Sequence, residues 1–165
     1  MSKNRRIVHI LVASAVVAAA TTVSAQHFTK RGAQCTDDGF TLTCSAEMAG
    51  LGNEDLTMSI QSDATATTVC VSHGGNEAPG QNPAIPGGVS GENTIPGSAI
   101  KNGRATISAT TDEPDTPTTQ AAGCPNPNWT VRVTDVTFSD IVVTIEQGDD
   151  VFTCTAAAPG KLSCS

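Results

Sequence analysis

Six cysteines constrain this 165-residue chain more than any other feature of its sequence. None of them belongs to a close Cys-x₂₋₄-Cys pair, the spacing typical of zinc sites, so disulfide bonding is the better interpretation. The first two and the last two cysteines each enclose a turn-forming segment, which predicts two local bridges. The middle two then remain to join the longer loops. The predicted pairs are Cys35–Cys44, Cys70–Cys124 and Cys154–Cys164.

The N-terminus has the pattern of a secretory signal peptide over residues 1–25. Three basic residues precede an apolar run over 7–20, and small residues lead to a predicted cleavage between Ala25 and Gln26. The apolar run of 14 residues is too short to span a bilayer as a helix. We therefore expect a secreted, extracellular protein with no membrane anchor in the mature chain, a compartment in which disulfides form readily.

Removing the signal peptide leaves a strongly acidic chain. Residues 26–165 hold six basic and sixteen acidic residues, a net charge of −10. This charge argues against nucleic acid as a partner, because nucleic acid binding needs a positive surface. Leu, Ile, Val and Phe make up only 17% of the mature chain, a fraction typical of disordered proteins. We expect the disulfides to supply the part of the folding stability that so small a core cannot provide.

Apolar and polar residues alternate with a period of two, which predicts β-strands, and helical periodicity is scarce. The alternation is clear in 56–60, 129–133 and 141–145, and 65–72 is rich in β-branched residues. The expected fold is all-β: a single immunoglobulin-like β-sandwich of about seven to nine short antiparallel strands, with long Gly/Pro-rich loops. We expect a flexible N-terminal arm over 26–34 and one disulfide-stapled domain over 35–165.

Two dipeptides predict tight hairpin turns. Asn102-Gly103 suits a type I′ turn, which sets Ile100 opposite Ala105. Gly148-Asp149 suits a type II′ turn, which sets Ile145 opposite Phe152 and Val143 opposite Cys154.

The sequence offers few residues for catalysis. The mature chain has two histidines, His27 on the arm and His73 before a Gly/Pro-rich segment, and no nucleophile motif accompanies either. Small acidic groups, such as Asp112-Glu113 with Asp115, fall in predicted turns, where Asp favours local hydrogen bonds. A secreted hydrolase is therefore the least favoured interpretation.

The turn carboxylates are also candidate ligands for calcium, a cation that takes oxygen ligands from loops. No segment has the spacing of a dedicated calcium loop, and no other cofactor or metal is predicted. The calcium candidates are Asp37, Asp38, Asp149 and Asp150.

Two long segments, 74–97 and 111–128, are predicted to be irregular binding loops that the Cys70–Cys124 bridge tethers to each other. Side-chain amides supply adaptable hydrogen bonds, and loops carried on a rigid sheet often serve recognition. The candidate binding residues are His73, Asn76, Gln81, Asn82, Asn126 and Asn128. They favour a non-catalytic protein that recognises an extracellular protein or polysaccharide, or that contributes to matrix or cell-surface structure.

The alternative function is a secreted carrier that holds an apolar ligand between its sheets, in a cleft lined by Met58, Trp129 and Phe138.

Lys30-Arg31 is either a processing site or a pair of solvated charges on the arm. Asn128-Trp129-Thr130 matches the acceptor pattern for N-glycosylation. The sequence makes no prediction of oligomeric state.

Overall fold

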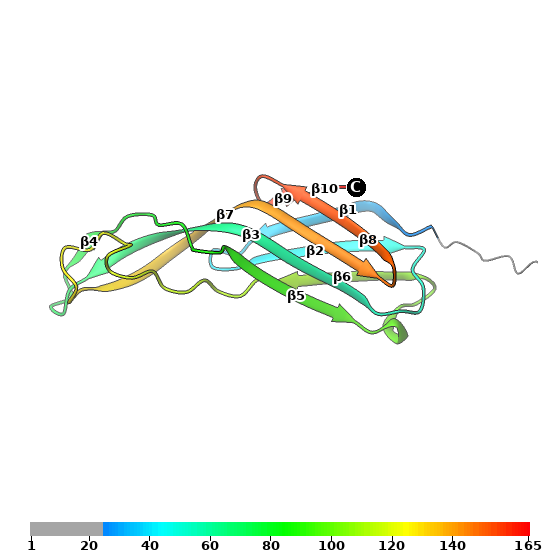
Figure 1. Cartoon of the computed structure of the whole chain (residues 1–165), viewed down its shortest axis with the longest axis horizontal. Helices are drawn as coiled ribbons and strands as arrows, with labels where there is room; N and C mark the ends of the chain where they lie inside the picture. Colours follow the sequence, from blue (N-terminus) through cyan, green and yellow to red (C-terminus); the bar gives the residue numbers. More distant parts are fainter. Residues whose placement is uncertain (1–24) are drawn as a thin grey trace, which may run out of the picture.

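The structure, a computed structural model, describes residues 25–165. The predicted signal peptide therefore lies outside the described residues, apart from Ala25. The described chain is all-β, with two antiparallel sheets and three disulfides. Its one helical element is a short 3₁₀ turn, η1 (Gly97–Ala99). The four-stranded sheet and most strands of the larger sheet lie toward one end of an elongated molecule, while β3 and β7 continue to the other end, where they carry β4 and the loops (Figure 1).

Ten strands make up the two sheets. The four-stranded sheet has the order β6 (Arg104–Thr110), β2 (Leu42–Ala49), β1 (His27–Asp37) and β9 (Gly160–Lys161). The other sheet has the order β10 (Ser163–Cys164), β8 (Asp150–Ala156), β7 (Thr130–Gln147), β3 (Leu56–Val71) and β4 (Glu77–Pro79), and β5 (Val89–Ile95) pairs with the first half of β3.

The core lies between the two sheets and follows the period-two pattern. Every second residue of β3 from Leu56 to Cys70 is buried, and β7 buries Ile141, Val143 and Ile145 in the same way. Leu42, Met48 and Ile107 complete the core from the opposite sheet. The alternating residues face outward and include several Thr and Ser side chains, so the apolar residues of these strands are concentrated on the inner face.

Strands β3 and β7 are much longer than predicted, with 16 and 18 residues. Each joins two segments that the sequence predicts as separate short strands. The two strands pair from Leu56↔Gln147 to Val71↔Thr130, with irregularities between Gln61 and Asp63 and between Thr67 and Thr68. Such bulges let a long ladder twist and bend without ending. The prediction of only short strands is therefore wrong.

Both predicted turns are present, but only one joins two strands of a hairpin. Gly148 has φ 59°, and the pairs Ile145↔Phe152 and Val143↔Cys154 confirm the predicted register of β7 and β8. Asn102 and Gly103 have φ 52° and 66°, as a type I′ turn requires. The residues before that turn form η1 rather than a strand, and β6 pairs with β2 instead.

The six cysteines form the three predicted pairs. Cys35 and Cys44 are direct register partners of β1 and β2, and Cys154 and Cys164 are direct partners of β8 and β10. The third bridge joins Cys70, at the far end of β3, to Cys124 in the long loop, with 5.6 Å between the Cα atoms. Two bridges thus reinforce neighbouring strands and one fastens a loop.

Two segments that the sequence predicts as irregular contain strands. Residues 27–34, predicted as a flexible arm, form the first part of β1 and pair with the end of β2. Segment 74–97, predicted as a loop, contains β4 and β5. Gly91 of β5 approaches the Thr110 backbone so closely that a Cβ atom would collide with the Thr110 carbonyl. A glycine-rich, polar segment can therefore form an edge strand where close approach, rather than apolar alternation, sets its position.

Removing the Cys70–Cys124 bridge by Cys70→Ala/Cys124→Ala should cost more stability than removing Cys154–Cys164 in the same way. The bridges enclose sequence separations of 54 and 10 residues. The loop-closure relation then gives upper values of about 4 and about 3 kcal/mol. Urea unfolding followed by circular dichroism measures both. Equal midpoints for the wild type and both variants would show that the fold does not depend on its bridges.

Ile145→Ala should lower the free energy of unfolding by about 2–5 kcal/mol, because it leaves a cavity in the core. Val142→Ala is the matched control on the same strand. Ile145 is 0% exposed and Val142 is 37% exposed, so the control should cost less than about 1 kcal/mol. Thermal unfolding of both variants checks the assignment of the inner face of β7, and a larger loss for Val142→Ala would contradict it.

Candidate functional site

The predicted binding residues gather around the far end of the β3–β7 pair, called here the tip. His73 and Asn76 lie in the exposed turn that follows β3, where the backbone N–H of Asn76 donates to Ser72 Oγ at 3.0 Å. Asn126 and Asn128 lie in the exposed turn that precedes β7, where the backbone N–H of Asn128 donates to Asn126 Oδ1 at 3.0 Å. The two turns are neighbours because Val71 pairs with Thr130.

Gln81 and Asn82 lie on the side of the tip rather than at its end. The backbone N–H of Gln81 donates to the Ala122 carbonyl at 2.8 Å, and the backbone carbonyl of Gln81 accepts from Thr68 Oγ1 at 2.6 Å. Asn82 lines a separate shallow depression beside Thr67. The six predicted residues are therefore all near the tip, but they do not share one concave site.

A groove of about 600 Å³ runs between the two predicted loop segments. Residues 83–90 form one wall and residues 112–121 the other, with Ile85 and Val89 buried below them. Four prolines contribute to the lining: Pro83, Pro86, Pro114 and Pro117. The volume is in the range of small-ligand and peptide-anchor sites. The predicted segments thus meet in a groove, which we call the loop groove.

Backbone hydrogen bonds to β3 hold the first wall of the loop groove in place. The Ile85 amide donates to the Ala64 carbonyl at 2.8 Å, and the Ala66 amide donates to the Pro83 carbonyl at 3.0 Å. This wall is therefore an extension of the sheet in which each proline sits where no ladder donor is needed.

The second wall is fastened at both ends and free between them. The Asp112 amide donates to the Ser90 carbonyl at 2.9 Å, and the Ala122 amide donates to the Thr118 carbonyl at 2.9 Å, close to the Cys124 bridge. Within the described residues, segment 113–117 makes no hydrogen bond. Two prolines restrict this segment instead, which lowers the entropy that binding would cost.

The loop groove carries negative charge without compensation. Asp112, Glu113 and Asp115 line it, and all three are exposed. The only ion pair among residues 25–165 joins Arg132 and Glu77, at 2.6 Å, and lies near the tip. The free carboxylates and the apolar floor suit a cationic segment that also carries an apolar side chain.

The four calcium candidates lie at opposite ends of β1. Asp37 and Asp38 accept hydrogen bonds from the Gly39 amide and the Thr43 hydroxyl within their own turn. Asp149 lies in the turn after Gln147 and Asp150 begins β8, and Gln147 bonds to Gln26, the residue before β1. Residues 25–165 contain no cluster of three or more side chains suited to a metal ion.

The three residues proposed for an apolar cleft do not meet. Met58 and Phe138 are buried in the continuous core, and Trp129 is half-buried at the tip. Met58 and the Phe138 partner Ala64 are six residues apart on β3, which is about 20 Å of strand.

The described residues contain no helix long and apolar enough to cross a membrane.

Comparison with models of protein families, with curated proteins and with solved structures finds no match for this chain. The site must therefore be interpreted from its own residues.

The sequence located the two segments that form the loop groove, but the candidate residues that it favours lie elsewhere in the same region. The predictions favoured the amides of the tip, whereas the groove is lined by carboxylates and prolines. The sequence signal is present in Asp112-Glu113-Pro114-Asp115, where three acidic residues flank a proline. That pattern also occurs in ordinary turns, and only the proximity of residues 83–90 makes it a groove.

Thr68→Val should loosen the first wall, because it removes the hydroxyl that donates to the Gln81 carbonyl. Thr68 is 3% exposed but Gln81 is an exposed residue, so the loss of this hydrogen bond should cost about 0.5–1.5 kcal/mol. Amide exchange at residues 80–82 should become faster. Thr67→Val is the control, because the Thr67 hydroxyl makes no hydrogen bond within the described residues. Equal exchange in both variants would contradict the role of Thr68.

Proposed function

We propose that this chain is a secreted, non-catalytic recognition protein that binds an extracellular macromolecule through the loop groove. The observation that carries the proposal is the set of three unpaired carboxylates on the second wall of the loop groove, which is fastened at both ends and restricted by prolines between them. Free charges on a restricted segment favour binding of a partner of opposite charge. The scaffold is immunoglobulin-like in this proposal, with loops carried by facing antiparallel sheets.

The proposed partner is a protein with a basic, extended segment. Lys or Arg side chains would pair with Asp112, Glu113 or Asp115, and an apolar side chain would lie over Ile85 and Val89. Arginine is the better fit, because its planar guanidinium binds a carboxylate through two parallel hydrogen bonds. The mature chain itself has a net charge of −10, which would also speed the encounter with a basic protein.

Secretion is part of the same proposal. Three disulfides are compatible with an extracellular location, and residues 1–25 have the pattern of a signal peptide. The free carboxylates would then meet partners in the medium or on the cell surface.

The test is quantitative affinity capture from the culture supernatant and surface extract of the source cells. The bait is the disulfide-intact protein or its groove variant Asp112→Asn/Glu113→Gln/Asp115→Asn. The control variant Glu146→Gln/Asp149→Asn/Asp150→Asn removes the same charge from exposed positions outside the groove. We expect the wild type and the control to enrich the same basic protein at least about tenfold more than the groove variant.

Captured protein should also be released by added salt, because exposed charge pairs are screened within about 10 Å at 0.1 M. Enrichment that is equal for all three baits, or that is confined to acidic or uncharged molecules, would overturn the proposal.

A further inference from the structure

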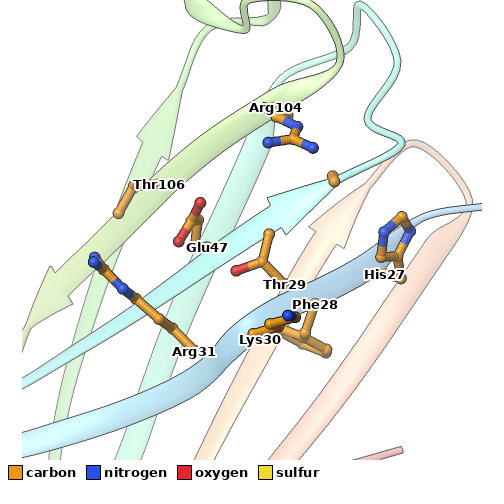
Figure 2. Close-up of a pocket in the computed structure, with 9 residues that line it drawn as sticks. His27, Phe28, Thr29, Lys30, Arg31, Glu47, Arg104 and Thr106 are labelled. Carbon is orange, nitrogen blue, oxygen red and sulfur yellow. The ribbon is translucent and has the colours of Figure 1, made fainter.

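A second groove, of about 750 Å³, lies on the outer face of the four-stranded sheet (Figure 2). We call it the basic groove. Its lining comes from the start of β1, the end of β2 and the start of β6. The residues are His27, Phe28, Thr29, Lys30, Arg31, Glu47, Ala49, Arg104 and Thr106.

An irregularity in β1 creates the basic groove. Strand β1 advances five residues from Phe28 to Ala33, while its partner β2 advances only two, from Met48 to Ala46. The three additional residues cannot pair and bend away from β2. Gly32, with φ 66°, allows this bend, because residues with side chains rarely adopt that conformation. A bulge of this kind redirects side chains, and here it directs Lys30 and Arg31 to the groove.

The basic groove reverses the charge of the molecule. It holds Lys30, Arg31 and Arg104, half of the six basic residues of the mature chain, together with His27. None of these four side chains forms an ion pair within residues 25–165, although Glu47 lies in the same groove. Cleavage before Gln26 would add an α-ammonium group next to His27. Free cations that share one concave surface in an acidic protein favour an anionic ligand.

Two further groups narrow the chemistry of that ligand. Figure 2 shows Thr29 and Glu47 among the basic side chains. Thr29 Oγ1 is buried and has no hydrogen-bond partner, although buried hydroxyls normally have one. Glu47 would repel a compact dianion such as sulfate or phosphate, but its carboxylate can accept hydrogen bonds from ligand hydroxyls. The groove therefore suits a ligand that carries both a single carboxylate and several hydroxyl groups.

We propose that the basic groove binds a carboxylated sugar unit of an acidic polysaccharide. The sugar carboxylate would lie on Arg31 and Arg104, and ring hydroxyls would bond to Thr29 and Glu47. This site and the loop groove are separate. Ser90 lines the loop groove and pairs with Gln61, five residues along β3 from Leu56, and Leu56 pairs with Gln147 at the end of the sheet where Gln26 is bonded. Those five residues span about 17 Å of strand.

The test is calorimetric titration of the secreted, disulfide-intact protein with trigalacturonic acid at low salt. The same trisaccharide as its methyl ester keeps the rings and hydroxyls but lacks the charge. Sodium sulfate is the compact anion. The variant Arg31→Gln/Arg104→Gln removes two groove cations. Lys101→Gln/Lys161→Gln is the control, since it removes the same charge at exposed residues outside the groove.

We expect the wild type and the control to bind the acid at least about tenfold more tightly than the groove variant does, because each charged hydrogen bond contributes at least about 1.4 kcal/mol. The methyl ester and sulfate should bind at least about tenfold more weakly than the acid. Equal affinity for the acid and its ester, tighter binding of sulfate, or equal losses in the two variants would each overturn the proposal. Failure here would leave the loop groove untouched, because its test uses different residues.

Discussion

The antiparallel pairing of β3 with β7 is the interaction on which the rest of the structure depends. Its first half supplies the centre of the larger sheet and much of the core, from Leu56 and Ile145 onward. Its second half continues beyond the sandwich and carries the tip (Figure 1). The loop groove forms only because Ala64 and Ala66 offer backbone hydrogen bonds to residues 83–85 beyond the edge of the main sheet. The Cys70–Cys124 bridge then holds the other wall to the same strand.

This arrangement explains how so few apolar residues are sufficient. A two-stranded ribbon alone is marginal in water, because neither face is covered. Here the loops cover one face of the ribbon and contribute the buried side chains of Ile85 and Ala122. The three disulfides restrict the unfolded chain while adding no apolar surface. The composition that is typical of disorder is thus compatible with a folded protein whose covalent bridges replace part of a core.

Local signals in the sequence were sufficient for the parts of the fold that local physics controls. The turn at Gly148, the register of β7 with β8 and the three disulfide pairs all follow from residues close in sequence or from simple elimination. The union of short strands into β3 and β7 was missed, because polar residues such as Asp63 and Asp140 interrupt the apolar alternation. Those residues lie at bulges, where the ladder continues although the pattern does not. The groove residues were missed for a related reason: a groove depends on which segments meet.

The net charge of the chain conceals how its charged side chains are distributed over the surface. A net charge of −10 argues against anionic partners for the molecule as a whole, yet the bulge in β1 collects three of six cations on one surface. Within a screening length of about 10 Å, a ligand responds to that surface and not to the distant carboxylates. The loop groove and the basic groove are separated by more than this length along β3, so each presents its own sign. An acidic protein can therefore present a negative groove at one site and a positive groove at another, because the fold and not the net charge decides where its few cations gather.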